Sequence, residues 1–237
     1  GLLLGGVIAG IINALAGGGS TITLPLLMLF GVDASVANGT NRVAVLCQSL
    51  SAGQSFSRHG AIDWQWTWRL LPLVLIGAIA GAVSASRIEA GKLEFIVGWI
   101  FLLLGLLLFG QGKLKRLIAT EKLRQIRAPM LVIIGFYGGF LQAGVGIPLL
   151  LAFLGLYRLK FADANGTKVV HIAIYSLVVL FIFGSANQVH ALYGLELGIG
   201  GIIGGHIGAR LAVRSKPRYL TPILATFLIF MGIKTLI

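Results

Sequence analysis

The chain has 237 residues, of which 57% are hydrophobic and 11% are charged. Soluble domains carry roughly a quarter charged residues, so this composition excludes an ordinary soluble domain and predicts an integral membrane protein. The net charge is +12, but the basic residues lie mostly between apolar segments. That placement is typical of cytoplasmic loops beside an anionic leaflet, so the expected partner is the lipid bilayer and not a nucleic acid.

Several segments are long and apolar enough to cross a bilayer, which requires roughly 20 residues in a helix. In chain order, these predicted transmembrane helices are Val36–Phe56, Trp68–Ser86, Leu93–Gly110, Ala162–Gly184, Leu192–Ala212 and Leu220–Ile237. A strongly charged stretch, Gln111–Pro129, follows the third of them and is expected in the cytoplasm.

Two further apolar regions are interrupted. Gly1–Phe30 is cut by "AGGGST", Ala16–Thr21, and then by Pro25. Met130–Tyr157 is cut by "QAGVGIP", Gln142–Pro148. Glycine runs and proline break helices, and broken backbone at membrane depth is tolerated only where it is buried in protein or lines a cavity. Each region is therefore predicted to be a broken helix or a re-entrant hairpin.

The two halves of the chain repeat. Pro25-Leu26-Leu27 matches Pro148-Leu149-Leu150, and the glycine pair Gly77/Gly81 matches Gly200/Gly204 at the same spacing. The glycine pairs are typical of closely packed helix faces. Gly39-Thr40 matches Gly166-Thr167 at a slightly larger spacing.

Charge then orients the repeats. With the basic stretch inside, the first hairpin would face outwards and the second inwards. We predict an all-α membrane protein of eight to ten helical segments, with two inverted-topology repeats, each a broken hairpin followed by three transmembrane helices. The repeats would cover 1–111 and 129–237, joined by a basic cytoplasmic linker, 112–128. Many secondary transporters have this architecture.

The hairpin breaks are the first candidate site. Glycines allow close approach to the backbone, and free N–H groups at a helix N-terminus attract anions. We expect Gly18, Gly19 and Ser20 in the first break, with Gly144 and Gly146 in the second, to bind a small anion. Alternatively, these glycines only permit tight packing.

Two polar segments are the second candidate site. "VANGTNRVAV", Val36–Val45, and "DANGTKVV", Asp163–Val170, share Ala-Asn-Gly-Thr followed by a cation, Arg42 or Lys168. A cation in a transmembrane segment costs about 3 kcal/mol or more and tends to face the protein interior. These cations either bind an anion or extend to the membrane surface.

Neighbouring polar residues could complete the site. Those expected to donate hydrogen bonds to the anion, or else to cap helices or join them, are Asn13, Asn38, Thr40, Asn41, Gln142, Asn165 and Thr167. His171 is a candidate proton carrier, with a structural role as the alternative. No enzymatic motif, cofactor motif or metal-ligand spacing is present, and the one cysteine, Cys47, lies in an apolar segment. The chain is therefore not expected to be an enzyme.

These motifs resemble those of the sulfite exporter TauE/SafE family of bacterial membrane proteins. The resemblance is carried by "NALAGGGSTITLPLL" and "ANGTNRVAV" in the first half, and by "GVGIPLLLAFLGL" and "ANGTKVV" in the second. It implies a multi-pass protein of the bacterial inner membrane that exports sulfite, sulfoacetate or related sulfonates by proton-linked secondary transport. The alternatives are a passive anion channel or a transporter of another small carboxylate or oxyanion. The glycine faces also permit a homodimer.

Overall fold

The computed structural model describes residues 1–109, 125–214 and 220–236, which form ten helices and no strand. The first half contains α1 (Leu2–Ala16), α2 (Ser20–Leu29), α3 (Ala34–Arg58), α4 (Trp64–Ser86) and α5 (Ala90–Phe109). The second half contains α8 (Arg127–Phe140), α9 (Gly146–Gly155), α10 (Phe161–Ser185), α11 (Ala191–Arg214) and α12 (Leu220–Leu236). The all-α prediction is confirmed, because the described residues form helices and no strand. Each half has two short helices followed by three long ones. Most of the predicted basic linker, 112–128, lies outside the described residues.

The first two helices form a hairpin. α1 ends at Gly17, whose φ of 81° is left-handed and whose N–H donates to the Asn13 carbonyl. α2 then runs back beside α1, so that Phe30 lies against Gly1. The predicted break is confirmed, but the prediction that Pro25 also interrupts the segment is wrong. Pro25 lies inside α2, which continues through it to Leu29 although proline removes one hydrogen bond of the helix.

The second hairpin is built in the same way. Between α8 and α9 the backbone turns through two left-handed residues, Gln142 with φ 69° and Gly144 with φ 67°. The two outer ends of the hairpin meet, because Arg127 lies 5.5 Å above the ring of Tyr157. Each of α2 and α9 has 10 residues. A helix of that length is about 15 Å long, which is half the thickness of the hydrocarbon core.

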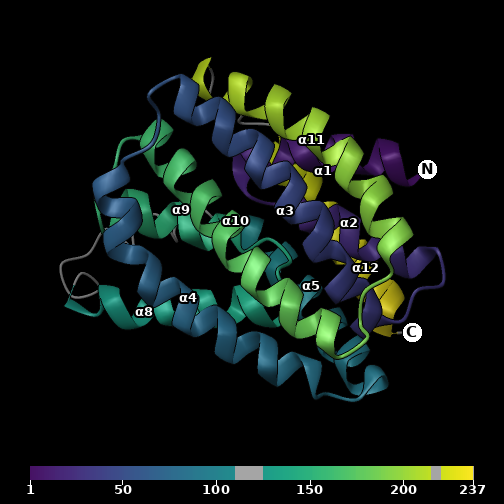
Figure 1. Ribbon diagram of the computed structural model, residues 1–237. Coiled ribbons are helices and arrows are strands. Elements are labelled where there is room, and N and C mark those ends of the chain that lie inside the picture. Colours follow the sequence, from purple (N-terminus) through teal and green to yellow (C-terminus); the bar gives the residue numbers. More distant parts are fainter. Residues whose placement is uncertain (110–124, 215–219, 237) are drawn as a thin grey trace.

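Each hairpin packs against the other half of the chain (Figure 1). α1 lies along α11, and α8 lies along α4. Gly77 and Gly81 on α4 face carbonyls of α8, while Gly200 and Gly204 on α11 face carbonyls of α1. A Cβ added at any of the four would lie 2.0 Å from a carbonyl oxygen. The predicted close-contact faces are therefore confirmed, and glycine is required there for the helices to touch.

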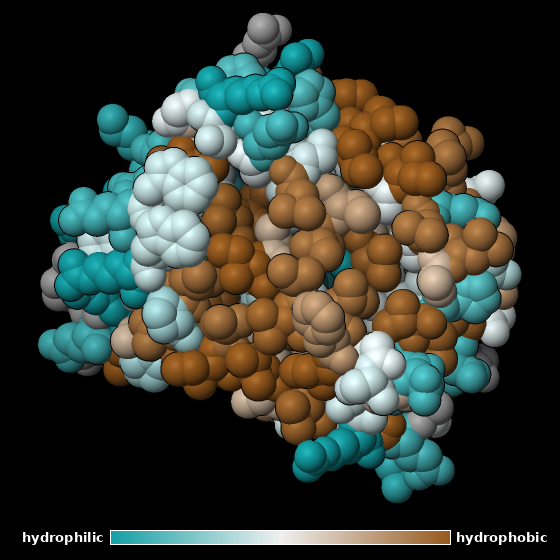
Figure 2. All heavy atoms as spheres, viewed as in Figure 1, coloured by the Kyte–Doolittle hydropathy of each residue, from teal (hydrophilic) through white to brown (hydrophobic). Residues whose placement is uncertain are grey.

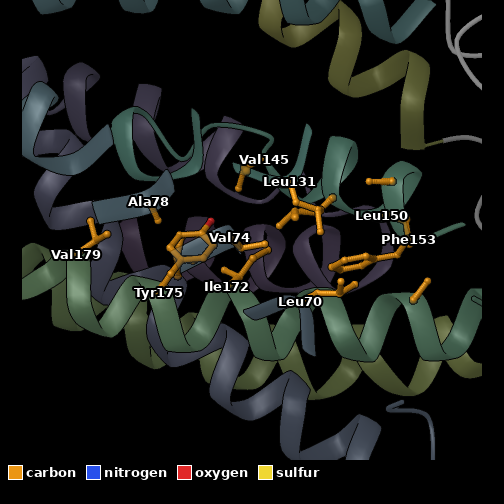
Figure 3. Close-up of a cluster of buried hydrophobic side chains, with 14 of the residues drawn as sticks. Leu70, Val74, Ala78, Leu131, Val145, Leu150, Phe153, Ile172, Tyr175 and Val179 are labelled. Carbon is orange, nitrogen blue, oxygen red and sulfur yellow. The ribbon is translucent and has the colours of Figure 1, made fainter. Parts of the chain in front are cut away.

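The long helices α3 and α10 cross in the centre and run antiparallel. Gly39, near the start of α3, lies against Phe183, near the end of α10, and Gly53 lies against Val169. Apolar side chains from α4, α8, α9 and α10 form a buried cluster beside this crossing (Figure 3). α5 and α12 pack against each other at the side of the molecule.

The outer surface of the helices is apolar (Figure 2). A broad hydrophobic area covers the middle of the visible face, with hydrophilic residues at its margins. Large apolar side chains are strongly exposed, and Phe181 on α10 is 73% exposed. α4 and α10 are both long and apolar enough to cross a membrane. This distribution is what a lipid environment requires, since lipid tails are as apolar as the side chains they meet.

Candidate functional site

Two cations lie in the protein interior. Arg42 on α3 and Lys168 on α10 are both 0% exposed. Neither faces a carboxylate, because the one salt bridge in the described ranges joins Lys92 and Glu89 on the surface. Burying a charge is costly unless polar groups surround it, so the neighbours of each cation define what it does.

Arg42 binds the C-terminal end of α8. Its Nη1 donates to the Gly138 carbonyl at 2.6 Å, and its Nη2 donates to the Gly139 carbonyl at 2.7 Å. The same nitrogens donate to the side-chain oxygens of Gln142 and, at 3.1 Å, Asn38. The last carbonyls of a helix lack partners within it and carry partial negative charge. Arg42 therefore caps α8.

Lys168 binds the C-terminal end of α1 in the corresponding way. Its Nζ donates to the Asn13 carbonyl at 3.1 Å and to Asn165 Oδ1 at 2.8 Å. Each broken helix is thus capped by a cation from the other half of the chain. Both side chains point into the protein, so they do not extend to the membrane surface.

The bends of the two hairpins touch each other. A Cβ at Gly17 would lie 2.4 Å from the Cα of Gly146. Ser20 Oγ donates to the Gln142 carbonyl at 2.9 Å and accepts from the Gly144 N–H at 3.3 Å. The two breaks of the sequence therefore meet in the structure. Both α2 and α9 begin at this contact, so their partially positive N-termini lie close together.

The predicted glycines have different surroundings. Gly19 packs tightly on α1, because a Cβ there would lie 2.2 Å from the Ala9 carbonyl. The Gly18 carbonyl accepts from Thr21 Oγ1 at 2.6 Å. Gly144 and Gly146 lie at the contact between the bends. These contacts support a packing role for Gly19. Anion binding by the residues of the two breaks stays a prediction.

The threonines of the two polar segments connect helices. Thr40 Oγ1 accepts from the His190 N–H at 2.8 Å. Thr167 Oγ1 accepts from Thr67 Oγ1 at 3.2 Å, which ties α10 to α4. These contacts hold the start of each long helix against the other half, and a role for either threonine in binding an anion stays a prediction.

The predicted amides lie close to the two caps. Asn38 Nδ2 donates to the Phe140 carbonyl at 2.7 Å, so it caps α8 together with Arg42. Asn41 Oδ1 accepts from Thr23 Oγ1, and its Nδ2 has no hydrogen-bond partner among the described residues. Asn41 Nδ2 is thus a buried donor that is available to a ligand.

His171 packs one turn after Thr167. Its Nδ1 lies 2.8 Å from the Thr167 carbonyl, and its ring lies 5.3 Å from the ring of Phe153. The Nδ1 contact requires the proton on that nitrogen, since a carbonyl only accepts. This environment is that of a histidine packed in the core, and proton coupling through His171 stays a prediction.

Three buried polar residues at the centre were not predicted. Gln48 on α3 has both amide atoms without a partner in the described ranges, and Ser176 Oγ is likewise unpaired. Tyr175 directs its hydroxyl towards Val145 of the second hairpin (Figure 3). Helical periodicity could have found them, because Gln48 follows Asn41, and Tyr175 follows Lys168, by seven residues on the same helix face.

Comparison with known proteins identifies the relationship. The family model of the sulfite exporter TauE/SafE family matches residues 2–235. The chain belongs to this family. Members related to it include a probable membrane transporter protein of Haemophilus influenzae, which is 27% identical over 97% of this chain and 91% of its own length. YjnA of Bacillus subtilis, also a probable membrane transporter protein, is 26% identical over 98% of both chains. YfcA of Escherichia coli is 26% identical over 97% of this chain and 86% of its own length.

No solved structure matches this TauE/SafE chain significantly. Family membership makes the chain a membrane protein and supports a membrane transporter. The sequence-based resemblance to this family is therefore confirmed. Within the described residues, no cluster of His, Cys, Asp or Glu could hold a metal ion.

Proposed function

We propose that the protein is a secondary transporter that exports small sulfur-containing anions, such as sulfite, sulfoacetate or related sulfonates, across the bacterial inner membrane. Transport of the anion would be linked to movement of protons. The observation that carries this proposal is a set of buried N–H donors without partners. Arg42 Nε, Asn41 Nδ2 and Gln48 Nε2 are all buried on α3 and lack a hydrogen-bond partner in the part of the chain described.

The charge of the buried residues Arg42 and Lys168 favours an anion as the ligand. Arg42 and Lys168 are both cationic side chains, and no buried carboxylate accompanies them among the described residues. Unpaired buried N–H groups cost free energy that an oxyanion would recover by accepting their hydrogen bonds. A cation would find few acceptors here, because Arg42 already occupies the carbonyls at the end of α8.

The contact between the hairpin bends favours alternating access over an open channel. Gly17 and Gly146 touch, and Ser20 bonds across the same contact. An anion would pass only if the two halves rocked relative to each other, as in transporters built from inverted repeats. The orientation of the repeats in the membrane and the direction of transport belong to this proposal.

The direct test is flux in proteoliposomes with sulfite, sulfoacetate and sulfate. We expect sulfite and sulfoacetate to be exchanged, and Arg42→Ala to lose most of this flux because α8 loses its cap and the region loses a permanent charge. Arg58→Ala is the matched control, since Arg58 is an exposed residue at the end of the same helix. Absence of anion flux in the wild-type protein would refute the proposal. Single-channel conductance that does not depend on a pH gradient would instead favour the alternative of a passive anion channel.

A further inference from the structure

The two capping cations, Arg42 and Lys168, differ in the number of hydrogen bonds that they donate. Arg42 donates four hydrogen bonds, two of them to the last carbonyls of α8, and lies 5.2 Å above the ring of Phe183. Lys168 donates two, to the Asn13 carbonyl and to Asn165 Oδ1. Arginine keeps its charge in proteins, whereas lysine can lose a proton. The pair of caps therefore combines one permanent charge with one that can change.

The hydrogen bonds of Lys168 suit both of its charge states. A neutral amine has two N–H donors, which is the number that the two acceptors of Lys168 require. Protonation adds a third donor and a full charge. An anion beside Lys168 would accept that third hydrogen bond and balance that charge, so the proton and the anion would stabilise each other.

Among the described residues, no carboxylate is placed to hold the charge of Lys168. On its own helix, Asp163 lies in the first turn. Asp63 caps α4 by accepting from the Trp66 N–H at 3.0 Å. Glu196 on α11 lies beside the middle of α3, since Gly194 and Gly198 on either side of it contact Val43 and Cys47. Lys168 lies beside the C-terminal end of α3, where Val169 meets Gly53.

The remaining described titratable side chains around α10 are arginines, histidines, tyrosines and one cysteine, and none is a carboxylate. On α10 itself these are His171 and Tyr175. The described side chains of the helices packed against it add Arg42, Cys47 and Arg58 from α3, Arg69 from α4, Arg127 and Tyr137 from α8, and Tyr193, His206 and Arg210 from α11. α1 and α9 contribute none. Burial without a carboxylate partner among the described residues disfavours the charge of Lys168, so its protonation gains most when an anion arrives with the proton.

The hairpin bends place two helix N-termini near Lys168. The Asn13 carbonyl that Lys168 binds also accepts from the Gly17 N–H at 2.8 Å. Gly19, which precedes α2, packs on the side chain of Asn13, and Gly17 packs on Gly146 at the start of α9. The N-termini of α2 and α9, each equivalent to roughly half a positive charge, therefore lie near Nζ.

We propose that Lys168 is the proton-carrying residue of transport. Nζ takes up one proton from the aqueous phase as the anion binds between the hairpin bends, and returns that proton as the anion leaves on the other side. Each anion is thus accompanied by one proton. This inference rests on the proposed anion transport and assigns proton coupling to Lys168 in place of His171.

The test compares proton and anion fluxes in the same proteoliposomes. Sulfoacetate is the probe, because its two acidic groups stay ionised near neutral pH and cannot carry protons themselves. A trapped pH dye reports protons, and labelled sulfoacetate reports exchange. For Lys168→Arg we expect sulfoacetate exchange to persist while sulfoacetate-driven proton flux falls to background. For Lys168→Gln we expect both to be lost. Lys160→Arg, at an exposed lysine just before α10, is the matched control and should keep both.

The outcomes separate the two proposals. If Lys168→Arg kept both anion exchange and full proton flux, the proton-carrying role of Lys168 would be overturned while the proposed anion transport would stand. A wild-type protein that moves no sulfoacetate would overturn the proposed sulfonate transport and this inference with it. His171→Gln gives an independent check that does not depend on the folding of the lysine variants. Loss of proton flux in His171→Gln, with exchange retained, would assign the proton to His171 and overturn the inference.

Discussion

Replacing Gly17 by alanine should separate the two hairpins. Two effects act at this position. The φ of 81° is left-handed, which costs a residue with a Cβ about 1–2 kcal/mol. The new methyl group would also lie 2.4 Å from the Cα of Gly146, and overpacking of this kind costs typically about 1–3 kcal/mol. We therefore expect a total destabilisation of roughly 2–5 kcal/mol.

The chain offers controls that isolate each effect. Gly31 and Gly60 have φ values of 79° and 62°, and an added Cβ at either would meet nothing within 4 Å. Gly31→Ala and Gly60→Ala should therefore show only the backbone cost, about 1–2 kcal/mol. Gly146→Ala should show only the steric cost, because Gly146 begins α9 with helical geometry while its Cβ would lie 2.3 Å from Gly17.

Thermal unfolding of the purified protein in detergent measures these differences, at about 2–4 °C per kcal/mol for a chain of this size. Anion exchange in proteoliposomes measures the functional effect. We expect Gly17→Ala and Gly146→Ala to lose exchange and the two control variants to retain it. Equal melting temperatures and equal exchange for Gly17→Ala and Gly31→Ala would refute the contact between the bends.

Three further changes follow from the same packing. Gly139→Ala would place a Cβ 1.8 Å from the carbonyl oxygen of Ala78 and should prevent α8 from packing on α4. We expect the folded peak to be lost in size-exclusion chromatography. Gly184→Ala is the control and should fold normally, because an added Cβ there meets nothing within 4 Å. Arg42→Lys keeps the charge but replaces a planar fork with a point charge, so we expect lower thermal stability by about 1–3 kcal/mol, and unchanged melting would contradict the capping role. Ser20→Ala removes the hydrogen bond to Gln142, at 2.9 Å, and should cost about 0.5–1.5 kcal/mol in the same melting assay; a stabilised variant would contradict this.

Much of the fold follows from hydrophobic length and glycine content. The apolar runs predicted α3, α4, α10 and α11 to within a few residues, because a helix in lipid must satisfy its own backbone. The glycine run Gly17–Gly19 marked the first bend, since three successive glycines both break a helix and allow φ above zero. The second bend lies at the start of the predicted break Gln142–Pro148, although a non-glycine residue, Gln142, takes one of its left-handed positions.

The sequence predicted which residues lie at the candidate site but not which residues they bind. Burial of Arg42 and Lys168 follows from the cost of a cation facing lipid. Their partners do not, because each cation binds a helix end from the other half, and no local pattern encodes a contact between residues as distant in the chain as Lys168 and Asn13. Gln48 and Tyr175 were missed because their surroundings come from other helices: Gln48 packs on Gly201 of α11, and Tyr175 packs on Gly138 of α8.

The exchange of caps has a consequence for biogenesis. Asn13 emerges from the ribosome long before Lys168, so α1 enters the bilayer with its Asn13 carbonyl bonded to the Gly17 N–H but without the cation of its cap. The end of α1 carries partial negative charge that this cation later stabilises. Neither half can therefore reach its final stability during synthesis of the first, and a cell that made the halves as separate polypeptides would complete each one only by joining it to the other.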